Sequence, residues 1–181
     1  MHLTIDQLEA GLETIRQSPK LEGVLHLIVR RPQVGEREVL DVGRLDPEEG
    51  LVGDTWKKRA SSRSADGLAH PHMQLNIMNS RAIALIAGDR SRWPLAGDQL
   101  FVDLDLSDEN LPPWTRLALG DAAIEVTDQP HTGCSKFNAR FGADALKFVN
   151  STVGRQLHLR GINARVVKAG AIRVGDRVRK I

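Results

Sequence analysis

Hydrophobic residues follow a helical spacing at the start of the chain. Between Thr4 and Gln17, aliphatic side chains recur every three or four positions. This spacing predicts an amphipathic helix over these residues. Thr4 is a good N-cap, because its hydroxyl can accept a hydrogen bond from a free N–H group of the first turn, and Pro19 ends the helix.

After this helix the pattern changes to short β-rich runs separated by glycine, proline and aspartate. Two further helices are predicted, over residues 79–87 and 137–148, and Gly142 divides the second. Strands and helices do not alternate regularly, so a doubly wound parallel sheet is not expected. We predict a β-rich α+β fold: a mixed sheet, curled or closed into a β-barrel, with a few peripheral helices. The predicted strands are residues 24–29, 39–42, 74–77, 100–104, 117–119, 123–126, 157–159 and 164–167.

The chain has 181 residues, which is long enough for one hydrophobic core, and no linker or internal repeat divides it. We expect residues 1–20 to form a helix packed on a single barrel domain of residues 21–181. No apolar run reaches the ~18 residues needed to span a bilayer, and no basic-then-apolar leader is present. A single cysteine excludes an internal disulfide. These features predict a cytoplasmic protein with a reduced thiol.

The charges are nearly balanced and interspersed. Twenty-five Lys and Arg residues face 23 Asp and Glu residues, giving a net charge of +2. This balance does not indicate a large nucleic-acid surface, and the lack of tyrosine argues against a base-stacking platform. We therefore expect neither a nucleic-acid nor a membrane partner. The basic segment Lys57 to Arg59, with Arg63, is either a solvated loop or a binding element for one small anion.

The single cysteine, Cys134, lies just before the predicted helix of residues 137–148. The positive end of that helix, the imidazole of His131 and the ammonium of Lys136 all favour its thiolate form. A thiolate is a nucleophile and a soft metal ligand. The alternative is a buried structural cysteine, but the polar, glycine-containing loop around it favours a functional thiol. His131 is either its base or a hydrogen-bonding loop residue, and Lys136 and Arg140 either hold an anion or are solvated.

Other metal and phosphate motifs are incomplete. His70-Pro71-His72 has no neighbouring acid or cysteine to complete a ligand set, so we interpret it as a surface loop. The spacings C-x-x-C, H-E-x-x-H, G-x-G-x-x-G and the P-loop do not occur. Cys134 and the scattered histidines offer too few ligands for a zinc site.

Five short motifs occur in an order that resembles the molybdenum cofactor sulfurase C-terminal (MOSC) domain family, in its stand-alone bacterial form. The resemblance spans about residues 24 to 180 and implies a β-rich, barrel-like domain. The motifs are residues 50–54, residues 96–100 leading to 109–111, residues 131–134, residues 160–164 and residues 174–176.

The resemblance also implies roles for individual residues. In the family, the cysteine that matches Cys134 carries sulfur as a persulfide or ligates the molybdenum of a bound pterin cofactor. Both roles agree with a thiolate, which His131 and Lys136 would favour. The residues that the resemblance places around the cofactor are Asp54, Asn110, Thr132, Gly133, Arg160 and Asn163.

The chain departs from the molybdenum-binding reductases of the family at residues 100–104. Those proteins often present an arginine-rich strand to the cofactor phosphate, whereas this segment contains Asp103. Stable binding of molybdopterin therefore requires that Arg160 or the Lys57–Arg59 loop replaces the missing charge. The chain has no large domain for pyridoxal phosphate, so that cofactor would belong to a partner enzyme.

Three functions stay open at this point. The first is a sulfur carrier that a cysteine desulfurase or sulfurase loads at Cys134 and that passes the sulfur to a metal–sulfur acceptor. The second is a molybdopterin-dependent reductase of N-hydroxylated bases or amines, with Cys134 as the metal ligand. The third is a non-catalytic ligand-binding module in which Cys134 is structural. Whether the protein is an enzyme depends on the role of this cysteine.

Overall fold

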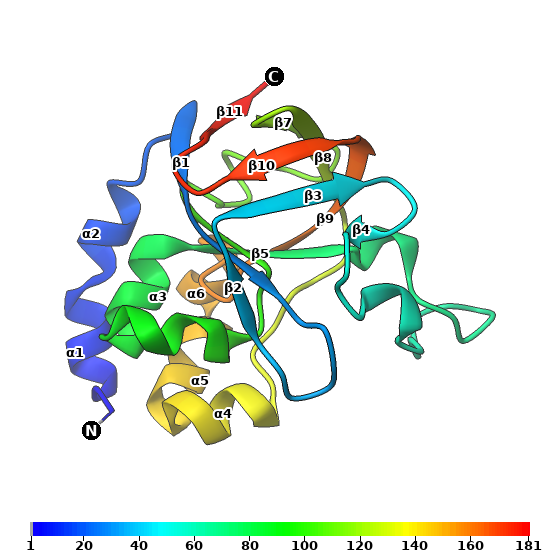
Figure 1. Cartoon of the computed structure of the whole chain (residues 1–181). Coiled ribbons are helices and arrows are strands. Elements are labelled where there is room, and N and C mark those ends of the chain that lie inside the picture. The colour runs from blue at the N-terminus through cyan, green and yellow to red at the C-terminus, as the bar shows by residue number, and fades with distance from the viewer. Residues whose placement is uncertain (1) are drawn as a thin grey trace.

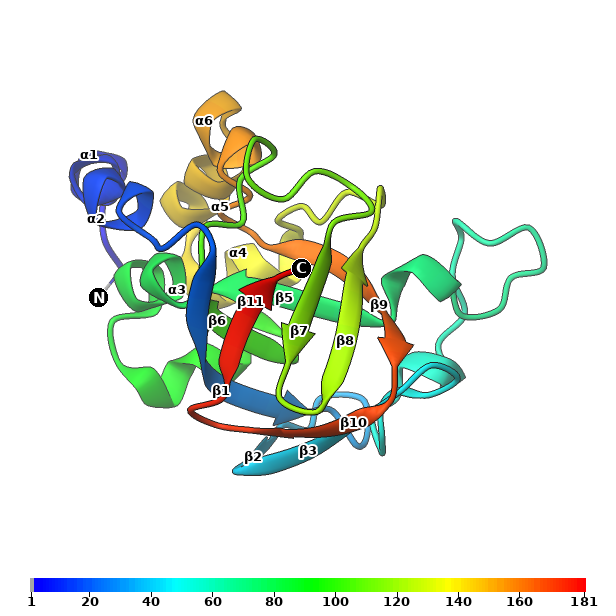
Figure 2. The ribbon, with the colours of Figure 1, turned by 90° about the horizontal axis from the view of Figure 1, so that it is seen from above.

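Seven strands close into a mixed β-barrel in the computed structural model, which describes residues 2–181 (Figures 1 and 2). The strands follow one another around the barrel in the order β11-β7-β8-β9-β5-β6-β1, and β11 pairs with β1 to close it. Only β5 and β6 run parallel. The predicted closed, mixed barrel is confirmed. The bounds are β1 (Glu22–Arg30), β5 (Leu75–Asn79), β6 (Leu100–Asp103), β7 (Arg116–Leu119), β8 (Ala122–Val126), β9 (Ile162–Lys168) and β11 (Arg177–Lys180).

The interior of the barrel is filled by aliphatic side chains from every strand of the ring. These side chains alternate with outward-facing residues, as the two-residue period of a strand requires. This core fixes the register of the strands, because a slip of one residue would turn the apolar side chains of the slipped strand toward the outside. Its fully buried members include Leu25, Ile28, Ile77, Leu100, Leu119, Ile124 and Ala164.

A second, three-stranded sheet lies beside the barrel. It consists of β3 (Val42–Asp46), β4 (Gly50–Leu51) and β10 (Gly170–Arg173), in the order β10-β3-β4. The run predicted as one strand over residues 39–42 is divided. Its first part belongs to β2 (Glu38–Leu40), which pairs with β1, and a bend at Asp41 directs the chain into β3.

The helices gather on one side of the barrel (Figure 2). The N-terminal segment forms α1 (Ile5–Ala10) and α2 (Leu12–Arg16), which contact α5 and α3 respectively. Thr4 caps α1 in a reciprocal capping box with Gln7, as its position predicted. The predicted helix at residues 79–87 is α3 (Ser80–Ala87), and η3 (Arg90–Ala96) follows it. Buried phenylalanines and aliphatic residues form a second core between these helices and the outside of the barrel.

Gly142 divides the segment after Cys134, as expected, into α4 (Ser135–Phe141) and α5 (Ala143–Asn150). The next helix, α6 (Thr152–Gln156), overturns the prediction of a strand at residues 157–159. Those residues continue from α6 as turns, and Leu159 packs into the helical core rather than into a sheet.

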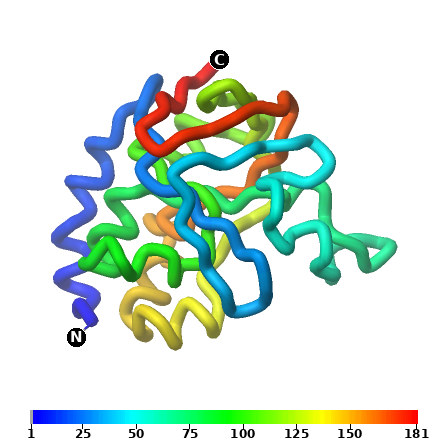
Figure 3. Tube along the Cα trace, in the orientation of Figure 1, coloured from blue at the N-terminus to red at the C-terminus, as the bar shows by residue number. Residues whose placement is uncertain are grey.

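The segment between β4 and β5 extends away from the barrel (Figure 3). It contains two short 3₁₀ helices, η1 (Trp56–Lys58) and η2 (Pro71–Met73). Among residues 2–181, none of the helices has the length and apolar character required to traverse a bilayer.

Candidate functional site

Cys134 lies in the wall of a cleft with a volume of about 890 Å³. Segments far apart in the sequence form this cleft: the turn after β1, the end of η1 with the residues after it, β5, the end of η3, α4, and Arg160 just before β9. Seven lining side chains are cationic and no lining side chain is acidic, so the cleft is strongly positive. The cations are Arg31, Arg37, Lys58, Arg59, Lys136, Arg140 and Arg160.

The thiol of Cys134 is exposed and stands at the N-cap of α4. Burial in the cleft alone would raise its pKa. The N–H groups of Phe137 and Lys136 and the charges of Arg160 and Lys136 outweigh that effect, so the pKa of Cys134 is lowered. The side chain makes no capping hydrogen bond, and these N–H groups therefore act mainly as partial positive charges. The prediction of an exposed thiol that favours its anion agrees with this geometry.

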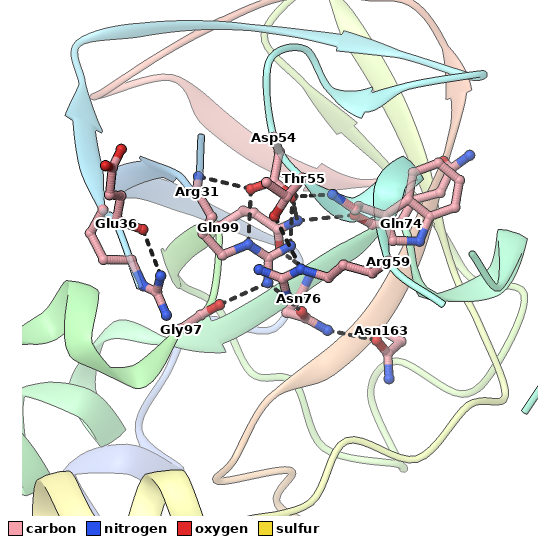
Figure 4. Close-up of polar contacts among 12 residues, drawn as sticks. Arg31, Glu36, Asp54, Thr55, Arg59, Gln74, Asn76, Gly97, Gln99 and Asn163 are labelled. Carbon is pink, nitrogen blue, oxygen red and sulfur yellow. Dashed lines mark hydrogen bonds and ion pairs between the residues drawn. The ribbon is translucent and has the colours of Figure 1, made fainter. Parts of the chain in front are cut away.

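Arg31 is fixed in the cleft by Asp54, whose side chain is fully buried (Figure 4). The carboxylate receives Nε of Arg31 at 2.8 Å and Nη2 at 2.7 Å, and it also accepts the backbone N–H groups of Arg31 and Trp56. Burial would raise the pKa of Asp54, but these bonds to Arg31 lower it overall. Asp54 thus positions a cation of the cleft and does not line the cleft itself.

Two asparagines connect this cluster to the loop before Cys134, and Figure 4 shows the contact between the two. Arg31 donates from Nη1 to Oδ1 of Asn76 at 3.2 Å, and Asn76 donates to Oδ1 of Asn163 at 2.7 Å. Asn163 in turn donates to the backbone carbonyl of Gln129. The loop of the thiol and the arginine of the cleft therefore share one hydrogen-bond network.

A second buried carboxylate, Asp98, lies between Arg160 and His131. Its Oδ2 accepts Nη1 of Arg160 at 2.6 Å, and its Oδ1 is 2.9 Å from Nε2 of His131. Burial would raise the pKa of Asp98, but the charges of Arg160 and His131 lower it to about 2. Arg160 also donates to the carbonyl of Ala96. Asp98 lies in the motif of residues 96–100 but was not predicted as a site residue, and the structure shows that it binds two predicted site residues.

The imidazole of His131 is not hydrogen-bonded to the thiol of Cys134. Among residues 2–181 the structure records no hydrogen bond between His131 and Cys134, and the imidazole is bound to Asp98 instead. Burial, followed by the charge of Arg160, lowers the pKa of His131, although Asp98 opposes this. Of the two readings of the sequence, the geometry favours the one in which His131 orders its loop.

Gly133 and Thr132 lie in the same loop but play different parts. The backbone of Gly133 exchanges two hydrogen bonds with the side chain of Asn150, at 2.9 and 3.1 Å. A Cβ atom on Gly133 would lie 2.7 Å from a methyl group of Leu146, so the loop packs closely on α5 here. Thr132 is exposed and lines a different pocket from the cleft of Cys134.

The structure does not bring Asn110 into the cleft. Its side-chain amide donates to the backbone carbonyls of Lys20 and Asp105, at 2.9 and 2.8 Å. Those bonds tie the loop after β6 to the chain just before β1. The expected place of Asn110 beside the cofactor is therefore corrected to a structural one, because both of its donor hydrogens are used on the backbone.

The basic segment after β4 reaches both the cleft and the cysteine loop. Lys58 and Arg59 line the cleft, and Arg63 donates to the backbone carbonyl of Pro130 at 3.0 Å. Burial and the charges of neighbouring arginines lower the pKa values of Arg37 and Arg59, which nevertheless remain charged at neutral pH. The cleft therefore gathers like charges, as a binding site for an anion does.

Sequence reasoning missed Arg31, Arg37, Asn76 and Gln99. Gln99 supports Asp54 and the backbone of Asn76. These residues are dispersed through the chain, and the one sequence signal is the pair Arg30-Arg31 directly after an apolar strand. Within the described part of the chain, no group of three or more His, Cys, Asp or Glu side chains could hold a metal ion.

Comparisons with known proteins fit this architecture. The family model described as "MOSC domain" matches residues 67–179. The YuaD protein from Bacillus subtilis is similar in structure, with a TM-score of 0.65 and 17% identity over 87% of this chain and 94% of that one. YiiM from Escherichia coli has a TM-score of 0.55 and 19% identity, covering 87% of this chain and 69% of its own. At these identities the likeness shows the fold alone. No curated protein matches the chain significantly.

Proposed function

The chain belongs to the MOSC domain family, and from this premise we propose that its basic cleft binds an anionic pterin cofactor of the molybdenum type beside Cys134. The family is associated with the molybdenum cofactor. One observation carries the proposal: an exposed thiol of lowered pKa lies in the wall of a cleft with seven cations and no acid. Such a cofactor combines a phosphate, which needs cations, with a metal–sulfur centre, which needs a soft ligand.

The residues present in the cleft fit this group. Arg160 is buried and lines the cleft, and its Nε has no hydrogen-bond partner among residues 2–181. A buried donor without a partner is costly, so a ligand that accepts from Arg160 would be stabilising. An anion would also relieve the repulsion among Arg31, Arg37 and Arg59.

In this proposal, the residues that the resemblance placed around the cofactor act in two ways. Arg160 and the other cations contact the ligand. Asp54 and Asn163 instead keep Arg31 and the cysteine loop in position, and Gly133 allows that loop to pack on α5. Ion pairs fixed by burial cost little reorganisation when the ligand arrives.

The first candidate function is sulfur transfer, and we propose that Cys134 carries the sulfur. Its thiolate attacks the terminal sulfur of a persulfide on a cysteine desulfurase or sulfurase. A new S–S bond forms at Cys134, the donor's S–S bond breaks, and the donor thiolate leaves, so no net oxidation occurs. The outer sulfur of the Cys134 persulfide is then released as sulfide to a metal–sulfur acceptor. This release needs two electrons, which two thiol groups of a reductant supply when they join in a disulfide. Pyridoxal phosphate belongs to the donor enzyme.

The seven cations favour a second candidate, a reductase of N-hydroxylated bases or amines. The sequence lacks the arginine-rich strand of such reductases, but the fold gathers equivalent charge from separate segments. When bound, the molybdenum cofactor supplies two-electron redox chemistry. Cys134 would be its protein ligand, and the surrounding cations would orient it.

Intact-mass spectrometry tests the carrier. Incubation with a cysteine desulfurase and cysteine should add about 32 Da, the mass of one sulfur atom, and a thiol reductant should remove it. The Cys134→Ser variant is the control and should gain nothing. No adduct on the native protein, or an equal adduct on the variant, would exclude sulfur carriage by Cys134.

Metal analysis separates the second candidate from the first. Protein made in a host that synthesises molybdenum cofactor should retain near-stoichiometric molybdenum and pterin if it is the reductase, and Arg160→Ala should lose both. If the protein retains only traces of molybdenum and pterin but gains the sulfur adduct, the sulfur carrier is the remaining candidate. If the folded protein shows neither, both candidates fail, and the non-catalytic binding module is the alternative.

A further inference from the structure

A second pocket lies on the other side of the loop that carries Cys134. It has a volume of about 400 Å³ and is formed by the ends of β8 and β9, the loop of residues 127–132, and α6. Cys134 does not line it, so the pocket and the basic cleft are separate. Its walls are mostly carbon and include Leu111, Val126, Val149 and Ile162.

His131 lines this pocket, and only one of its two ring nitrogens is used by Asp98. The imidazole is bound through Nε2 to Asp98, and 15% of its side-chain surface remains exposed. Asp98 is ionised by its pairing with Arg160, and an ionised carboxylate accepts a proton-bearing nitrogen. Nε2 therefore carries a hydrogen. Burial and the charge of Arg160 lower the pKa of His131, which favours the neutral imidazole at pH 7, and in that form Nδ1 is an acceptor. Among residues 2–181, Nδ1 has no recorded hydrogen-bond partner.

The charges near the pocket lie at its rim. Asp108, Asp128 and Arg155 are exposed, and Asp108 is 3.0 Å from Nε2 of His158. An anion would be drawn to the seven cations of the cleft instead. The interior thus combines apolar walls with a few polar side chains, among them Thr127, Asn163 and His131 with its Nδ1 acceptor, which is the usual composition of a small-molecule site.

We propose that this pocket is a second ligand site, which takes a small, uncharged, largely apolar ring compound whose single N–H or O–H group donates a hydrogen bond to Nδ1 of His131. The exposed hydroxyl of Thr132 lies at the same rim and offers a further, weaker contact. The site does not depend on the function proposed for the cleft.

Three simple probes test the site. Indole has one N–H donor, 1-methylindole lacks it, and 3-methylindole keeps the donor and adds the same methyl group elsewhere. Titration of the native protein, followed by methyl NMR, should shift Val126, Val149 and Ile162 but not Ile172, which is buried in the barrel core. Indole and 3-methylindole should bind roughly three- to tenfold more tightly than 1-methylindole, as expected for one hydrogen bond.

Two variants locate the acceptor. His131→Phe should abolish the difference between indole and 1-methylindole, whereas Thr132→Ala should preserve it. Equal binding of the probes by the native protein would overturn the assignment of His131 as the acceptor. The absence of shifts at the three pocket methyl groups, or shifts confined to Ala60, Ala96 and Ala139 of the cleft, would overturn the site itself. The comparison of probes on the native protein stands even if His131→Phe does not fold.

Discussion

At the scale of single residues, two buried carboxylates set the geometry of the cleft. Asp54 fixes Arg31, and Asp98 fixes Arg160 together with His131. A buried charge without its partner is strongly unfavourable, so each arginine is confined to the place where its carboxylate lies. These two cations of the cleft are in this way positioned by residues that do not line it.

Replacement of Asp98 by asparagine leaves the guanidinium of Arg160 buried without a counter-charge. We expect Asp98→Asn to lower the free energy of unfolding at pH 7 by about 3–5 kcal/mol, measured by urea denaturation. Asp121→Asn, at an exposed position, is the control and should change it by less than about 0.5 kcal/mol. A loss of similar size in both variants would contradict the role of Asp98.

The same carboxylate predicts a pH dependence. The pKa of Asp98 falls from 3.8 to about 2 on folding, so its stabilising effect is complete above pH 3.8 and is lost as the pH falls toward 2. The pKa of His131 is also lowered from 6.5, so stability begins to decline as the pH falls below 6.5. Urea denaturation from pH 7 to 2 should show both declines, and the difference between native protein and Asp98→Asn should shrink below pH 4. A constant difference would contradict this assignment.

Lys136 should influence the reactivity of the thiol. Its charge and its backbone N–H group help to lower the pKa of Cys134, and Lys136→Ala removes the charge. We expect the pH profile of iodoacetamide alkylation to move to higher pH, so that the rate at pH 7 falls. Lys147→Ala, on the exposed side of α5, is the matched control. If alkylation of the native protein were as slow as unfolding, Cys134 would be structural and not reactive.

Single residues also show where sequence reasoning succeeds. Cys134 and Lys136 were predicted to share a site because they are neighbours along the chain. Arg31, Arg37 and Asp98 were not predicted to belong to it, because only the folded barrel brings the two arginines into the cleft and places Asp98 against Arg160. A Gly-Asp pair such as Gly97-Asp98 resembles a surface turn until tertiary structure buries its carboxylate.

At the scale of elements, strands with a run of apolar residues were predicted and strands with few apolar residues were not. β1, β5, β6, β7, β8 and β9 coincide with predicted runs. β4 has only two residues, and β10 and β11, although as long as β6 and β7, contain only one or two apolar side chains each. The run Leu157-His158-Leu159 alternates like a strand, but it follows directly from α6, and His158 has a positive φ of 48°. Local alternation over three residues carries too little information to exclude a turn.

The junction between α4 and α5 depends on Gly142. Its φ of 90° and ψ of 166° lie in a region that only glycine occupies readily, and a Cβ atom there would lie 2.6 Å from Nδ1 of His2. We expect Gly142→Ala to lower the free energy of unfolding by about 1–3 kcal/mol in urea denaturation. Gly67→Ala, at an open loop position with a φ of 71°, should cost less. The reverse order would show that the junction tolerates a side chain.

At the scale of the whole molecule, a nearly neutral chain places seven of its 25 cationic side chains around one cleft. The net charge is only +2, yet the cleft collects seven cations without an acid. Low-dielectric walls around such a group raise the local potential and attract anions from solution. The overall composition therefore concealed a feature that the fold creates.

Pyrophosphate should detect this potential. We expect it to raise the melting temperature at low ionic strength, by about 2–4 °C for each kcal/mol of binding free energy, and added salt should reverse the effect. Arg37→Ala should weaken the response, and Arg173→Ala, on β10, should not. An equal response of both variants would show that the anion binds outside the cleft.

The pairing of β1 with β11 has a consequence for biosynthesis. Glu22 lies opposite Arg179, so the ring cannot close until β11, more than 150 positions after the start of β1, has left the ribosome. Until then β1 keeps an open edge, which is a template for pairing with other nascent chains. Because contacts so remote along the chain also form slowly, cells that make this protein at high rates should rely on chaperones to shield the unfinished ring.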